Sequence, residues 1–286
     1  KMGNRRLGRK RLEAVLKNLN AQEPDSTGSR SGLRGFEMPS WQLQPAKYFG
    51  LFDDFISVSG VTDLAANDDF FLAHAASGLC GATWDVTLGG GGSPAAVLNN
   101  TIPGGVISLL AGTADDDIAR IFAPNHMFTV DAASSRKIWM EARLKVTDVS
   151  DNGFLFGLAS TGGEAVDTAF AAAGLDTAIA WQMVDGQAST SIASICAIGD
   201  VETVTASTVT SGAVVAGAMP DDTFVILSIY FDGTTAHYYV NGKISHSTVS
   251  SIPADGEAMY PHLEFIQQTQ NNDMLTIDYV NYCMER

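Results

Sequence analysis

Hydrophobic and polar residues alternate along much of the chain after Lys47, a pattern typical of strands that bury one face. The clearest run spans 137–146, and a second strand is expected at 154–158 after the turn at 151–153. We predict that the two form a hairpin. One side of the first strand carries Ile138, Met140, Ala142, Leu144 and Val146, and the other, expected to be exposed, carries Trp139, Glu141, Arg143 and Lys145.

A second group of strand patterns lies toward the end of the chain. It predicts a meander of three strands at 224–231, 235–240 and 243–249, separated by Asp-Gly and Asn-Gly turns. Many short strands with turns between them indicate an all-β sandwich or jelly roll that forms one domain over residues 48–286. Further strands are expected at 47–58, 107–110, 126–130, 262–267 and 274–283.

Two segments do not fit the strand pattern. The Ala-rich stretch 168–175 suits a short helix or a loop packed on the sandwich. Residues 89–92 are four consecutive glycines, which suit a mobile loop. A phosphate-binding loop needs a Lys and a Ser or Thr at set spacing, and Gly-Ser-Pro stands here instead, so we do not expect phosphate binding.

Helical periodicity marks the start of the chain, where 5–20 reads as a helix with one apolar stripe that includes Leu12, Leu16 and Leu19. The segment 22–35, rich in Ser, Gly, Asp and Pro, reads as a linker. We predict that residues 1–47 form a basic helical arm that docks on an acidic protein surface, or alternatively on phosphates; a frayed, solvated terminus is the other interpretation. The docking residues would be Arg5, Arg6, Arg9, Lys10, Arg11, Leu12, Leu16 and Leu19.

The distribution of charge also changes after residue 47, where the predicted arm ends. The whole chain of 286 residues has a formal net charge of −15, yet residues 1–47 hold ten Lys/Arg against four Asp/Glu, and the remainder holds seven against 28. A +6 arm is therefore joined to a −21 body, which makes nucleic-acid binding by the body unfavourable. No apolar run approaches the length of a membrane span, and no apolar segment follows the basic start as in a secretory signal, so we expect no membrane partner.

Cysteine, acid and histidine spacing offers no recognisable catalytic or metal site. Cys80, Cys196 and Cys283 are scattered, and we expect buried free thiols in a reducing compartment. The acid clusters at 53–54, 68–69, 115–117 and 221–222 lack a calcium-loop pattern and are expected to be solvated surface. His237 and His246 flank the Asn-Gly turn and are expected to face each other as a cross-strand pair. No Ser-His-Asp constellation can be assembled from the sequence.

The strand 137–146 and the meander with Tyr-Tyr-Val-Asn-Gly-Lys at 238–243 resemble the concanavalin A-like lectin/glucanase and laminin-G sandwiches. The opening Met-Gly-Asn-Arg-Arg-Leu-Gly-Arg-Lys-Arg at 2–11 resembles virion proteins of tailed phages, particularly marine and cyanobacterial ones. Together the resemblances imply a concanavalin A-like jelly-roll sandwich on a capsid cement or decoration protein. Such a protein would bind the major capsid protein or another virion protein, self-associate, for instance as a trimer, and reside in virions assembled in the host cytoplasm.

The fold resemblance also leaves two alternatives. One is a carbohydrate-binding virion module that recognises host glycan, with aromatic candidates Trp139, Trp181, Tyr230, Tyr238 and Tyr239. The other is a glycoside hydrolase, which would need two acids on one strand face, and the sequence lacks the alternating acid pattern of those enzymes. We therefore expect no enzyme activity, no cofactor and no metal.

Overall fold

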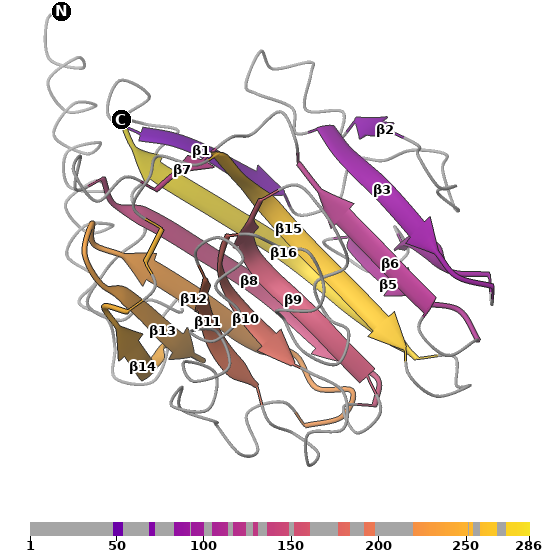
Figure 1. Cartoon of the computed structure of the whole chain (residues 1–286). Helices are drawn as coiled ribbons and strands as arrows, with labels where there is room; N and C mark the ends of the chain where they lie inside the picture. The colour runs from indigo at the N-terminus through magenta and orange to yellow at the C-terminus, as the bar shows by residue number, and fades with distance from the viewer. Residues whose placement is uncertain are drawn as a thin grey trace, which may run out of the picture.

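The computed structural model describes residues 48–53, 69–71, 83–91, 93–99, 105–113, 117–123, 128–130, 136–148, 152–160, 177–183, 192–197, 220–250, 252–253, 258–267 and 273–286. These residues form two antiparallel sheets that lie face to face with their strands running in similar directions (Figure 1). The predicted all-β sandwich is confirmed.

Sheet A contains the predicted meander and both ends of the described chain. Its order is β14-β13-β12-β8-β16-β5-β4, and β1 pairs with β16 beyond the end of β5. The strands are β1 (Tyr48–Asp53), β4 (Ala95–Asn99), β5 (Val106–Leu110), β8 (Ile138–Val146), β12 (Val225–Phe231), β13 (Ala236–Val240), β14 (Lys243–Thr248) and β16 (Met274–Glu285).

Sheet B has the order β11-β10-β9-β15-β6-β3-β2, and β7 pairs with the start of β15. The inner strand β9 is buried along its whole length, which explains its continuous run of apolar residues and glycine. The strands are β2 (Asp69–Phe71), β3 (Thr83–Gly89), β6 (Asp117–Phe122), β7 (Phe128–Thr129), β9 (Asn152–Ala159), β10 (Ala178–Met183), β11 (Ala193–Ala197) and β15 (Ala258–Gln267).

The core fills the space between the sheets with large side chains that alternate along each strand, including Trp84, Trp181, Phe154, Phe156 and Phe265. Polar tips of three core residues cross from one sheet to the other. Trp181 Nε1 donates to Ser228 O at 3.2 Å, Tyr282 Oη donates to Gly157 O at 3.1 Å, and Tyr238 Oη donates to Ile195 O. Because buried polar groups need partners, these bonds hold the two sheets in one position relative to each other.

Several predictions about the strands are confirmed and one about their pairing is wrong. The strand at 137–146, the three-stranded meander and its Asn-Gly turn are present, and Asn241 and Gly242 both have positive φ. The predicted hairpin of 137–146 with 154–158 does not form, because β8 lies in sheet A between β12 and β16, and β9 lies in sheet B between β10 and β15. The chain therefore passes from sheet A to sheet B between β8 and β9.

The acid cluster at 115–117 is also not simply solvated surface. Asp117 is fully buried at the start of β6, and its Oδ1 accepts a hydrogen bond of 2.8 Å from the backbone N–H of Gly91. Gly90 has a φ of +110°, and a Cβ there would lie 1.8 Å from that same oxygen. A glycine is therefore required where this loop folds over the carboxylate.

Cys196 and Cys283 are buried and free, as expected, and burial raises the pKa of each thiol to about 12. Cys80, the arm 1–47 with its docking residues, and the segment 168–175 lie outside the described residues. Within the described residues, no helix is long and apolar enough to cross a membrane.

Candidate functional site

A cluster of charged and polar side chains lies on the face of sheet B that is turned away from sheet A. We call it the sheet B cluster: Thr87 on β3, Arg120 on β6, and His262 and Glu264 on β15. The strand register places Thr87, Arg120 and Glu264 directly opposite one another across three neighbouring strands. The cluster therefore arises from cross-strand pairing of residues far apart in the chain.

Hydrogen bonds and charge connect the four residues. His262 Nε2 lies 3.1 Å from Glu264 Oε2, and Arg120 Nη1 lies 4.0 Å from the same oxygen. Arg120 Nη2 donates to Thr87 Oγ1 at 3.3 Å, and its guanidinium lies 5.6 Å from the centre of the Phe122 ring. Glu264 thus sits between a histidine and an arginine, and the arginine is held by further contacts with Thr87 and Phe122.

The unusual feature of this cluster is the complete burial of the Glu264 carboxylate. The Glu264 side chain is 0% exposed, His262 is 4% exposed, and Arg120 keeps 17% of its side chain accessible. Removing a carboxylate from water costs several kcal/mol unless charged partners compensate. Here the His262 imidazole and the Arg120 guanidinium lie beside the carboxylate and can compensate this cost.

Half-buried residues surround the cluster on the same face. Asp85 and Phe122 are opposite each other on β3 and β6, and Tyr260 precedes His262 by two positions on β15. Alternation along a strand places these side chains on the side of Arg120 and Glu264, opposite Trp84 and Ile121, which are in the core. The site therefore combines a buried charged centre with an accessible rim that contains two aromatic rings.

The outer face of sheet A carries a different arrangement. Trp139, Tyr230, Tyr239 and Cys283 form a small buried cluster, and the Trp139 and Tyr230 ring centres are 5.4 Å apart. Glu141, expected to be exposed, is only 5% exposed: it accepts hydrogen bonds from Ser228 Oγ at 3.0 Å and Tyr279 Oη at 2.9 Å. Burial, and after it the charge of Glu141 and the hydrogen bond to it, raise the pKa of Tyr279.

The five aromatic residues named as candidates for sugar contact therefore lie elsewhere than the sheet B cluster. Trp181 and Tyr238 are in the core, where their rings meet edge to face at 5.2 Å. Trp139, Tyr230 and Tyr239 belong to the buried cluster on sheet A.

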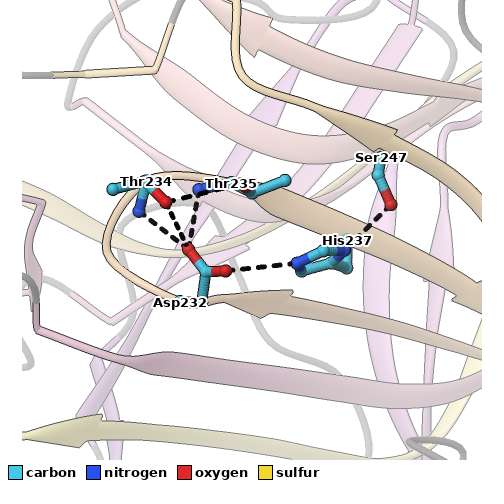
Figure 2. A network of polar contacts seen from close by, with 5 residues as sticks. All are labelled: Asp232, Thr234, Thr235, His237 and Ser247. Atoms are coloured by element: carbon cyan, nitrogen blue, oxygen red, sulfur yellow. Dashed lines mark hydrogen bonds and ion pairs between the residues drawn. The ribbon is translucent and has the colours of Figure 1, made fainter.

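The meander contains a second polar network that the sequence did not reveal (Figure 2). His237 was expected to face His246, but it pairs with Ser247, and His246 pairs with Tyr238. The cause is a register shift between Tyr238 and Tyr239, which gives β14 one extra residue at Ser245. His237 Nδ1 lies 2.8 Å from Ser247 Oγ, and His237 Nε2 lies 3.4 Å from Asp232 Oδ2.

None of the four residues of the sheet B cluster was predicted from the sequence. The available signal was the alternation of His262 and Glu264 with apolar residues on one strand, which places both on one face. Arg120 and Thr87 join them only through pairing that the sequence does not specify. In the described residues no group of three or more His, Cys, Asp or Glu is arranged to hold a metal ion.

No family model matches the chain, and no curated protein matches it. Among solved structures, the Crh5 transglycosylase in complex with NAG aligns over 82% of this chain and 83% of its own, with 13% identity and a TM-score of 0.51. The metal-free carbohydrate recognition domain of Emp46p aligns over 70% and 87%, with 7% identity and a TM-score of 0.47. A conserved carbohydrate esterase of the Shiga toxin-encoding bacteriophage phi24B aligns over 70% and 89%, with 14% identity and a TM-score of 0.40.

At these identities the likeness concerns the fold. The chain has the two-sheet antiparallel sandwich that the sequence resemblance implied, and it shares this fold with the Crh5 transglycosylase structure.

Proposed function

We propose that this protein is a carbohydrate-binding module and that its glycan site is the sheet B cluster with its rim. The observation that carries the proposal is Glu264, a fully buried carboxylate held between Arg120 and His262 on the outer face of a sheet. Sugar hydroxyls both donate and accept hydrogen bonds, and the Arg120 guanidinium, which lies beside the buried Glu264 carboxylate and keeps part of its side chain accessible, can donate to them. The Phe122 and Tyr260 rings offer apolar surface for the C–H face of a sugar ring.

The same cluster argues for binding without cleavage of the sugar chain. Hydrolysis of a glycosidic bond ordinarily needs two carboxyl groups, one on either side of the bond. The sheet B cluster and its rim contain two, Glu264 and Asp85, but the Glu264 carboxylate is fully buried beside His262 and Arg120, so of these two only Asp85 is accessible to a sugar. The expectation that the protein is no glycosidase is part of this proposal.

The test is direct binding of the whole chain to an array of polysaccharides and of N-acetylglucosamine oligomers, followed by calorimetry on any hit. Arg120→Met should weaken binding by about tenfold or more, because a charge-assisted hydrogen bond to the sugar is lost. Arg136→Met is the matched control, since Arg136 is an exposed arginine outside the strands, and it should bind as the unaltered chain does. Absence of any hit, or unchanged affinity of Arg120→Met, would contradict the proposal.

The division of charge favours a second function, that of a virion decoration protein. A +6 arm on a −21 body suits attachment of the arm to an acidic capsid surface, while the bodies repel one another until the arm anchors them. In this proposal the partner is the major capsid protein and the protein resides in the virion. A glycan site on the outward-facing sandwich is compatible with that position.

A further inference from the structure

Asp232, His237 and Ser247 form a continuous chain of polar contacts on the meander of sheet A (Figure 2). Asp232 follows β12, His237 is on β13, and Ser247 is on β14. Ser247 Oγ is 2.8 Å from one ring nitrogen of His237, and Asp232 Oδ2 is 3.4 Å from the other. A hydroxyl, an imidazole and a carboxylate in this order are the arrangement that activates a serine.

The two oxygens of Asp232 have separate partners. Oδ1 accepts hydrogen bonds from the backbone N–H groups of Thr234 and Thr235, both at 2.8 Å, and from Thr234 Oγ1 at 2.9 Å. Burial opposes the charged form, but these bonds and the contact with His237 outweigh it and lower the pKa of Asp232 below its ordinary value. Because Oδ1 and the backbone hydrogen bond from Asp232 N–H to Thr235 O, at 3.1 Å, already close the turn, the turn does not need the contact between Oδ2 and the imidazole.

The imidazole is held from a second direction. Tyr230 is opposite His237 on β12, and the two rings are stacked with centres 5.8 Å apart and planes 15° apart. The extra residue at Ser245 brings Ser247, rather than His246, opposite the histidine. The orientation of His237 is therefore fixed by its stacked neighbour and by a carboxylate, as a general base requires.

The group that would react is accessible. Ser247 is exposed on β14, the edge strand of sheet A, and the His237 side chain is 19% exposed. We propose that Ser247 is an activated nucleophile that accepts acyl groups from esters of small carboxylic acids, an activity separate from the glycan site on sheet B.

In the proposed step Ser247 Oγ attacks the ester carbonyl carbon, and the hydroxyl proton passes to His237 Nδ1. Asp232 stabilises the resulting imidazolium through Nε2–H. The bond from carbon to the alcohol oxygen then breaks, the departing alcohol takes the proton from Nδ1, and an acyl ester remains on Ser247. Water hydrolyses this ester by the same route and releases the carboxylic acid.

The experiment treats the full chain with a biotinylated fluorophosphonate, which traps activated serines, and measures the rate at which individual serines are labelled by peptide mass mapping. Ser250 is an internal control because it is an exposed serine three residues further along the chain. We expect Ser247 to be labelled about a hundredfold faster than Ser250, the size of a general-base contribution. His237→Gln should reduce the Ser247 rate to that of Ser250, and the full chain should release p-nitrophenolate from p-nitrophenyl acetate in a reaction that Ser247→Ala abolishes.

Equal labelling of Ser247 and Ser250 in the unaltered chain would overturn the proposal without any variant having to fold. An unchanged Ser247 rate in His237→Gln, with the circular dichroism spectrum of the parent, would also overturn it.

Discussion

At the scale of single residues, the hydrogen bonds to Asp232 make a specific prediction about acid stability. Its carboxylate is stabilised in the folded chain, so its pKa lies below the ordinary value of 3.8. A group with a lowered folded pKa stabilises the protein above its unfolded pKa, and the contribution disappears as the pH falls through the folded pKa. Asp232→Asn should therefore lower the free energy of unfolding at pH 7 by about 1 kcal/mol, and the difference should shrink below about pH 4.

Urea unfolding of the two chains at a series of pH values measures this difference. Thr234→Val is a graded control, because it removes one hydroxyl donor to Asp232 and leaves the two backbone donors. Thr234→Val should lower the free energy of unfolding at pH 7 by less than Asp232→Asn does. A difference for Asp232→Asn that stays constant from pH 7 to pH 2.5 would contradict the argument.

The sequence predicted the turns of the meander but not the pairing of His237 with Ser247. Asp-Gly and Asn-Gly dipeptides specify tight turns through the backbone preferences of their own residues, and both turns of the meander are present. The bulge at Ser245 leaves no mark in the pattern of hydrophobic and polar residues, because one extra residue in an exposed edge strand changes no buried position. The pairing of His237 with Ser247 therefore could not be predicted.

At the scale of strands, the contact between β9 and β10 leaves no room at Gly157. A Cβ on this residue would lie 2.3 Å from Ile179 O and 2.5 Å from Ala180 Cα, which are backbone atoms that cannot turn aside. Gly157→Ala should lower the free energy of unfolding by about 2 kcal/mol or more, because β9 and β10 must move apart to admit the Cβ. Since Gly157 is also opposite His262 across β9 and β15, the same change should weaken any glycan binding by the sheet B cluster.

Gly89→Ala is the matched control, because a Cβ at Gly89 would meet no atom within 4 Å. It should change the free energy of unfolding by less than about 0.5 kcal/mol in the same denaturant titration. Equal stability of the two variants would show that β9 and β10 are further apart than described.

At this scale the sequence predicted where strands lie but not how they pair. Alternation located β8 to within one residue, since a half-buried strand shows its inner face directly. It could not show that β9 belongs to the other sheet, because the apolar run of β9 is compatible with several partners. The cluster of Arg120, His262 and Glu264 depends on the pairing of β6 with β15, which the alternation of residues does not specify either.

At the scale of the whole molecule, the sandwich has a core of its own. The main buried cluster extends from Leu51 on β1 to Met284 on β16, and these terminal strands pair with each other through most of β1. A chain that begins at residue 48 keeps every one of these contacts. We therefore predict that deletion of residues 1–47 leaves the free energy of unfolding within about 1 kcal/mol of the full chain.

The same deletion should have a large effect on attachment if the arm docks on an acidic capsid surface. It removes ten of the 17 Lys and Arg residues and takes the net charge from −15 to −21, so that attraction to an anionic partner becomes repulsion. The full chain should sediment with phage heads at low salt and dissociate as salt rises, because exposed charges are screened within about 10 Å at 0.1 M. The truncated chain should remain in the supernatant at all salt concentrations. Decoration of heads by the truncated chain would exclude the arm as the anchor, whereas binding of both chains to glycan would show that the sandwich alone carries the site.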